Sequence, residues 1–143
     1  MSAAEVGEVV AETTYALDRG SLVRYAGASG DFNPIHYRDD VAASVGLPGV
    51  LAHGMLTMGL AVQPVVAWLE SIADPGQAPG WVTDYQVRFT RPVVVDPEAG
   101  AEVTVTAKLA QVDDEGATGR IDLTVTAAGQ TVLGKAQVRV AFA

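Results

Sequence analysis

GMLTMGLAVQPVVAWL, residues 54–69, is an almost uninterrupted apolar run. Because its apolar side chains are not confined to one stripe, we expect a helix that is buried on most sides rather than an amphipathic surface helix. Pro64 lies inside the run, where a proline removes a backbone hydrogen bond and clashes with the preceding turn, so we expect a kink or a break near residues 62–63. This run predicts the core helix of the fold.

The period of the sequence changes after this run. Residues 84–90, 101–112, 118–126 and 131–142 alternate apolar and polar side chains, and turn-forming segments separate them. The alternation predicts an antiparallel meander with one buried face. One long apolar helix followed by successive strands predicts an α+β fold in which the sheet wraps around the helix.

Shorter elements are expected before the apolar run. Residues 9–17 are rich in β-forming side chains and predict a strand. Asp18 offers an N-cap to a helix over residues 19–26, which should end in the glycines that follow. Residues 39–45 predict a brief helix capped by its two aspartates and ended by the next glycine and proline.

Length and composition restrict the class of protein. We expect one domain over residues 1–143. A formal charge of −8 opposes binding to nucleic acids and anionic membrane surfaces. With no cysteine and two histidines, neither a thiolate nucleophile nor a metal site is expected. Residues 1–12 resemble no secretory signal, and no apolar stretch approaches membrane-spanning length, so we expect a cytoplasmic protein.

A polar turn precedes the apolar run. GDFNPIH, residues 30–36, places a carboxylate, an amide and an imidazole close together, and Pro34 holds Asn33 in an extended or turn geometry. Asp31 and His36 can then face the same side and share a water, one removing a proton while the other donates one. The alternative is an ordinary turn in which Asp31 accepts backbone N–H bonds and His36 packs as a partly buried polar residue. These residues alone favour the ordinary turn.

His53 and Gly54 stand at the start of the predicted core helix. A glycine there exposes an unpaired backbone N–H, and the helix dipole adds positive potential. Gly54 is therefore a candidate oxyanion donor to an acyl carbonyl, although it would serve equally well to permit close packing. We expect His53 to be structural. Ser29, Ser44 and Thr57 stand in no nucleophile-elbow pattern, so a covalent acyl-enzyme is not expected.

Taken together, residues 25–36 (YAGASGDFNPIH) and 52–59 (AHGMLTMG) resemble the hydratase 2 motif of the MaoC-like, (R)-specific enoyl-thioester hydratases and dehydratases. The likeness covers most of the chain, since its length, its order of elements and the late segment 85–93 also agree. Within the family it is similar to the HadB-type subunit of (3R)-hydroxyacyl-ACP dehydratases. The resemblance implies a hot-dog fold, an antiparallel sheet wrapped around a long buried helix, and a pair of such folds as the functional unit.

The resemblance also implies roles for single residues. Asp31 and His36 match the catalytic pair, Asn33 matches the polar residue that positions water or substrate, and the Gly54 N–H matches the donor to the thioester carbonyl. The implied reaction is the syn addition of water to a trans-2-enoyl thioester, or the reverse dehydration of a (3R)-hydroxyacyl thioester, without a cofactor.

Two features of the implied site stay open. Many relatives carry a serine later on the core helix, where this chain has Ala61 and Val62, so a hydroxyl from that helix is in doubt. Either coenzyme A or an acyl carrier protein can present the acyl group, and by charge Arg88 and Arg91 are possible contacts for its phosphate. The partner is either a second copy of the chain or another hot-dog subunit.

Two other functions use the same scaffold. A hot-dog thioesterase usually places its carboxylate on the core helix, and residues 54–69 contain no Asp or Glu, which favours hydration over hydrolysis. A non-catalytic acyl-binding subunit of a heterodimer is the other alternative. The presence of Asp31, Asn33, His36 and Gly54 would make this chain the catalytic member of such a pair.

Overall fold

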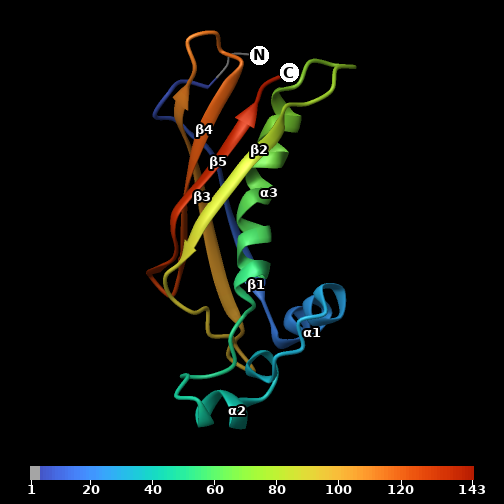
Figure 1. Ribbon diagram of the computed structural model, residues 1–143, viewed down its shortest axis with the longest axis vertical. Helices are drawn as coiled ribbons and strands as arrows, with labels where there is room; N and C mark the ends of the chain where they lie inside the picture. The colour runs from blue at the N-terminus through green and yellow to red at the C-terminus, as the bar shows by residue number, and fades with distance from the viewer. Residues whose placement is uncertain (1–3) are drawn as a thin grey trace.

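The computed structural model describes residues 4–143, so the first three residues of the expected domain lie outside the described part. The elements follow the chain in this order (Figure 1): β1 (Val9–Leu17), α1 (Arg19–Ser29), a 3-10 turn η1 (Pro34–His36), α2 (Asp39–Ser44), α3 (Gly54–Ile72), β2 (Trp81–Phe89), β3 (Ala101–Val112), β4 (Thr118–Ala127) and β5 (Gln130–Ala141). The helix and the strands expected from the sequence are all present.

The strands form one antiparallel sheet in the order β1-β3-β4-β5-β2, and α3 lies along one face of it. This is the hot-dog arrangement, so the expected α+β class and fold are confirmed. The expected meander is right for β3, β4 and β5 but wrong for β2, which pairs with β5, placing Tyr85 opposite Val138. Because β1 and β4 occupy both edges of β3, β2 does not pair with the strand that follows it in the sequence and lies at the outer edge of β5 instead.

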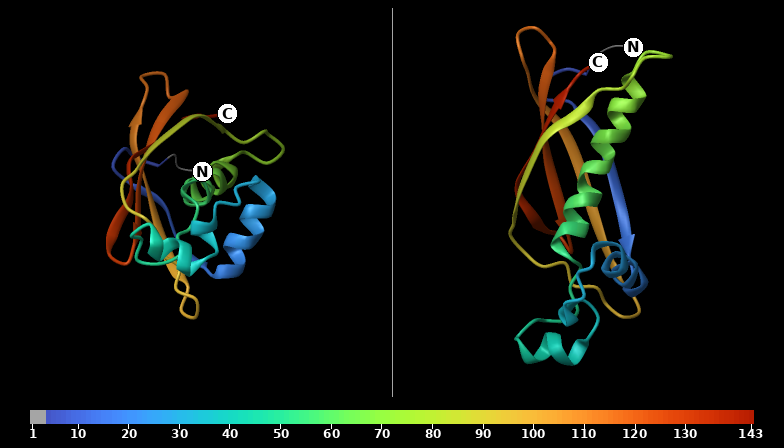
Figure 2. Two further views of the ribbon diagram at one scale, coloured as in Figure 1. Left: turned by 60° about the horizontal axis from the view of Figure 1, so that its bottom comes forward. Right: turned by 45° about the vertical axis from the view of Figure 1, so that its right-hand side comes forward.

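The burial of α3 differs from the expectation of a helix buried on most sides. Its buried residues lie on one face, toward the sheet: Thr57, Ala61, Pro64, Val65 and Leu69. The opposite face is open, and Met55 is 59% exposed. Figure 2 shows the reason, since the sheet of a single chain covers only one side of the helix.

Pro64 does not break α3, which is continuous to Ile72. The expected break is therefore wrong, and burial of the Pro64 ring against the core offsets the lost backbone bond. By length and composition alone, α3 is long and apolar enough to cross a membrane. The expectation that no apolar stretch approaches membrane-spanning length is therefore wrong. In the structure it is the core helix of the fold.

The short helices gather at the end of the molecule where α3 begins (Figure 1). Asp18 caps α1 as expected, accepting the Ser21 N–H at 2.7 Å, and Gly30 ends the helix with a positive φ of 77°. The N-cap of α2 is Arg38, so the two aspartates expected to cap it lie in its first turn instead. There their charges still favour the positive end of the helix.

Candidate active site

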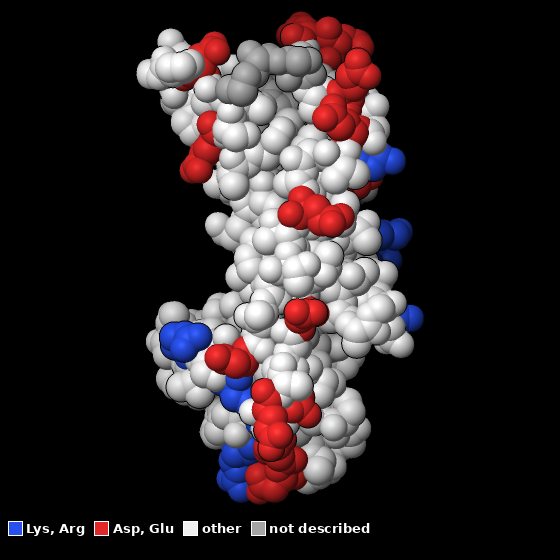
Figure 3. Space-filling view, turned by 180° about the vertical axis from the view of Figure 1, so that it is seen from behind, with Lys and Arg blue, Asp and Glu red and all other residues white. Residues whose placement is uncertain are grey.

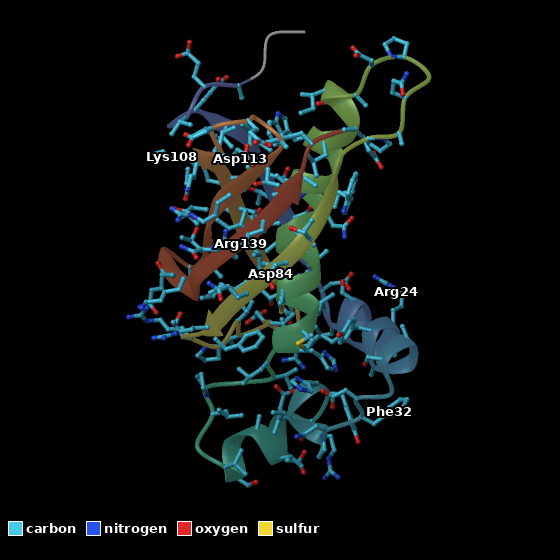
Figure 4. The ribbon with its side chains drawn as sticks, turned by 45° about the horizontal axis from the view of Figure 1, so that its top comes forward. Arg24, Phe32, Asp84, Lys108, Asp113 and Arg139 are labelled. Atoms are coloured by element: carbon cyan, nitrogen blue, oxygen red, sulfur yellow. The ribbon has the colours of Figure 1, made fainter. Side chains whose placement is uncertain are left out.

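The turn between α1 and α2 is held by a chain of side-chain caps. The Asp31 Oδ1 accepts the backbone N–H of Asn33 at 3.1 Å, and the Asn33 Oδ1 accepts that of Ile35 at 3.2 Å, which starts the 3-10 turn. Phe32, between them, is exposed and points outward (Figure 4). One oxygen of Asp31 and the side-chain oxygen of Asn33 thus accept backbone N–H bonds, as in an ordinary turn. The second oxygen of Asp31, Oδ2, takes no part in the turn and is available to a water or substrate.

His36 presents its Nε2 to that oxygen. Its Nδ1 lies 2.7 Å from the carbonyl oxygen of Leu51, and since a carbonyl only accepts, Nδ1 carries the hydrogen. In the neutral ring Nε2 then holds a lone pair, 3.8 Å from the Asp31 Oδ2. An oxygen atom ~2.8 Å from both atoms fits this separation, as a shared water would. His36 is 9% exposed, while the carboxylate is about half exposed.

His53 supports both members of this pair. Its ring stacks on His36 with a centroid distance of 3.8 Å and an angle of 21°, and Tyr25 packs against its edge. The Nε2–H of His53 donates to the backbone carbonyl of Asp31 at 3.1 Å. Burial lowers the pKa of His53, and the neighbouring His36 adds to the lowering. A neutral His53 that orients Asp31 and His36 agrees with the structural role expected for it.

Gly54 begins α3 at the wall of a cleft of about 300 Å³, which His36, Thr57, Phe89 and Arg91 also line. Within residues 4–143, no acceptor is found for the Gly54 N–H. A Cβ atom added at Gly54 would lie 3.0 Å from two carbons of the Phe89 ring. Both interpretations of Gly54 thus have a structural basis: close packing against Phe89, and a free donor at the cleft.

The other predicted residues differ in their position relative to the cleft. Arg91 lines it and donates from Nη1 to the Thr131 carbonyl at 3.2 Å. Arg88 does not line it, because along β2 its side chain alternates with that of Val87, which packs on the core. Asn33 is exposed and lies outside the lining, as does Asp31. The structure therefore gathers His36, Gly54 and Arg91 at one cleft and places Asp31 beside His36.

One cleft residue was missed as a functional candidate. Thr57 is 3% exposed and lines the cleft, yet its hydroxyl was considered only as a nucleophile. The signal was its spacing, three residues after Gly54, which puts both residues on one face of a helix.

The side chains of Asp31, His36 and His53 bring their possible metal-ligating atoms within 4.8 Å of one another. This donor set fits a metal ion poorly. The Nε2 of His53 is committed to a carbonyl, and its Nδ1 is buried. One carboxylate oxygen and one ring nitrogen remain, fewer than the three or four protein ligands of a typical site.

Charge around this end of the molecule is mixed. Figure 3 shows acidic and basic side chains side by side at the end that holds α2. Two ion pairs join α2 to neighbouring segments, Arg19–Asp39, at 3.0 Å, and Arg38–Asp40. Figure 3 also shows acidic side chains over much of the rear face, consistent with the net charge of −8.

Comparison with known proteins gives a family match over most of the chain. A family model described as a MaoC-like domain matches residues 2–128. The chain is similar to 3-hydroxyacyl-thioester dehydratase X of Mycobacterium tuberculosis (strain ATCC 25618 / H37Rv), with 38% identity over 80 residues. Those residues are 56% of this chain and 25% of that protein.

Solved structures agree with this match. A MaoC-like dehydratase superposes with a TM-score of 0.87 and 39% identity over 98% of this chain and 41% of its own. R-hydratase PhaJ1 from Pseudomonas aeruginosa superposes with a TM-score of 0.75 and 27% identity over 97% of this chain and 82% of its own. The HadBC (3R-hydroxyacyl-ACP dehydratase) complex from Mycobacterium tuberculosis superposes with a TM-score of 0.67 and 18% identity over 90% of both chains. This is a likeness of fold alone. The chain thus spans less than half the length of dehydratase X and of the first structure.

Proposed function

The chain belongs to the MaoC-like dehydratase family, and on that premise we propose that it hydrates trans-2-enoyl thioesters to (3R)-hydroxyacyl thioesters, or catalyses the reverse dehydration. One observation carries the proposal: the His36 Nε2 faces the Asp31 Oδ2 at 3.8 Å, and His36 lines the same cleft as Gly54, whose N–H has no acceptor among residues 4–143. The similarity to 3-hydroxyacyl-thioester dehydratase X and to R-hydratase PhaJ1 supports the reaction class.

The mechanism follows from these positions. In hydration, Asp31 and His36 hold a water between them, and its oxygen attacks C3 of the enoyl group while its proton passes to the pair. The electrons of the double bond move onto the thioester oxygen, where the Gly54 N–H stabilises the enolate charge. A proton from the pair then adds to C2 on the same face, which completes a syn addition. Dehydration reverses each step, and no cofactor takes part.

The substrate is an acyl group on coenzyme A or on an acyl carrier protein. Both carriers present a phosphate, and a cation near the cleft would favour it. Arg91 is the better candidate for that contact, because it lines the cleft while Arg88 does not. Asn33 is left with its amide N–H groups for a water at the edge of the site, since its carbonyl oxygen caps the 3-10 turn.

We further propose that residues 1–143 form one hot-dog domain that works in a pair. The open face of α3, with Met55 exposed, and the exposed aromatic rings of Trp81 and Phe89 on the edge strand β2 leave apolar surface for a second subunit. That subunit is a second copy or a different hot-dog chain. The presence of Asp31, Asn33, His36 and Gly54 supports a catalytic, HadB-type member of such a pair.

The test is to incubate the purified chain with crotonyl-CoA while following both the enoyl absorbance and the release of free thiol. We expect the absorbance to fall without thiol release, and chiral analysis to give the (3R)-hydroxy product. Thiol release with an intact enoyl group would instead identify a thioesterase. Measuring the mass of the active species separates a homodimer from a chain that gains activity only with a co-expressed partner. No hydration by either form would contradict the proposal.

A further inference from the structure

Among residues 4–143, three polar side chains are buried, and all three lie at the N-terminal end of α3: His36 at 9%, His53 at 1% and Thr57 at 3% exposure. A buried polar group is informative because removing it from water costs free energy unless a partner replaces the water. His36 and His53 have partners that explain their positions. Thr57 has no such explanation.

The hydroxyl of Thr57 behaves differently from the helical serines. Ser44 and Ser71 each donate to a carbonyl three residues earlier, at 2.7 Å, which is a usual outcome for a hydroxyl on a helix. For the Oγ1 of Thr57, the described part of the chain offers no hydrogen-bond partner. The His53 carbonyl, four residues earlier on the chain, already receives the N–H groups of Leu56 and Thr57 at 3.0 and 3.2 Å.

This hydroxyl is also not sealed inside the protein. Only the Nδ1 of His53 is both fully enclosed and unpaired among the described side chains. Thr57 lines the same cleft as Gly54 and His36, and its spacing of three residues places it on the helix face of Gly54. Its hydroxyl therefore meets the space that a bound thioester would fill.

We propose that Thr57 is a substrate-contacting residue whose hydroxyl is the second donor, beside the Gly54 N–H, to the thioester oxygen. The inference rests on the proposed hydratase function and deepens it. A carbonyl oxygen has two lone pairs, so one backbone donor leaves the second without a protein donor. The next residue on this face, Ala61, is fully buried and carries no polar group, so no donor deeper on the helix replaces Thr57.

The kinetic test compares Thr57→Val, which keeps the shape and removes the hydroxyl, with Thr57→Ser, which keeps the hydroxyl. Loss of one oxyanion donor lowers kcat by roughly 10²-fold, so we expect such a loss for Thr57→Val and near-normal kcat for Thr57→Ser. Thr124→Val, an exposed threonine on β4, is the matched control for the same chemical change and should leave kcat unchanged. Circular dichroism melting checks that each variant folds.

A spectroscopic test separates a donor from a merely structural residue. The chromophore of 2,4-hexadienoyl-CoA absorbs at longer wavelength when its carbonyl is polarised, so its red shift on binding reports the donors directly. In the Asp31→Asn background, where turnover is blocked, we expect a clear red shift. Adding Thr57→Val should reduce the shift, and adding Thr57→Ser should not. If Thr57→Val melts early, Thr57→Ala takes its place, because a smaller side chain does not overpack the site.

The outcomes distinguish this inference from the function beneath it. A wild-type chain that fails to hydrate crotonyl-CoA, alone or with a partner, overturns the proposed function and the role of Thr57 with it. An active wild type whose Thr57→Val variant keeps its kcat within twofold, or keeps the full red shift, overturns the role of Thr57 alone.

Discussion

The two ends of α3 are built differently. At the N-terminal end lie His36, His53 and Thr57, the buried polar side chains of the described chain. At the C-terminal end Leu69 is buried, and Trp68 meets Phe142 edge to face at 6.1 Å. Apolar burial stabilises a fold without directing chemistry, whereas an unpaired buried group such as the His53 Nδ1 costs roughly 1–3 kcal/mol. The C-terminal end of α3 thus contributes mainly to stability, and the N-terminal end carries the polar groups that can take part in chemistry.

The largest expected effect on stability lies at the apolar end. Leu69→Ala removes a fully buried side chain from the core and should lower the free energy of unfolding by about 2–5 kcal/mol, because transfer and cavity terms add. Urea denaturation measures this, with the neighbouring exposed Glu70→Ala as the control. The kcat of the folded variant should stay at the wild-type value. If Leu69→Ala kept its stability but lost kcat, the proposed difference between the two ends of α3 would be wrong.

The opposite pattern is expected for Gly54→Ala. Alanine suits a helix, but its Cβ would press on the exposed Phe89 ring and narrow the cleft at the Gly54 N–H. Stability should change by less than about 1 kcal/mol, while kcat/KM falls by roughly 10-fold or more. Gly27→Ala on α1, where a Cβ meets nothing within 4 Å, is the matched control. Unchanged kcat/KM in Gly54→Ala would leave Gly54 with a packing role only.

A smaller effect is expected from the titration of His53. Its folded pKa is lowered by burial, so the unfolded chain binds more protons as the solution becomes acidic. The stability that this neutral ring contributes is present above about pH 6.5 and is lost as pH falls through the folded pKa. The Tm of the wild type should therefore drop between pH 7 and pH 5. His53→Gln keeps an N–H donor but does not titrate, and its Tm should fall less. If the Tm of the wild type and of His53→Gln fell equally with pH, the titration of His53 would not contribute to the pH dependence of stability.

Much of the fold could be predicted from the sequence because its signals are local. The apolar run of residues 54–69 indicated α3, and alternation over residues 101–112 indicated β3. The position of β2 at the far edge could not be predicted, because strand order depends on which edges other strands occupy. The one-sided burial of α3 was also missed. Apolar composition shows that a helix can be buried on most sides, but it does not show how much of the helix surface the sheet of a single chain covers.

The candidate site divides in the same way. The spacing of Asp31 and His36 on a proline turn was visible in the sequence. The tautomer of His36 was not, because it is set by the Leu51 carbonyl fifteen residues away, and neither was its stacking on His53. Arg88 and Arg91 look equivalent in the sequence, but Arg88 lies on β2 and outside the cleft lining, whereas Arg91 follows the end of β2 and lines the cleft.

The most direct test of the central claim is the kcat/KM for crotonyl-CoA of Asp31→Asn and His36→Ala, each compared with the wild-type chain in the same assembly. If the two residues act as one acid-base pair, each variant should lose at least about 10²-fold, and the double variant should lose little more, because removing either member disables the unit. Their Tm values should stay within a few degrees of the wild type, well above that of Leu69→Ala. Near-normal kcat/KM in either folded variant would contradict the account.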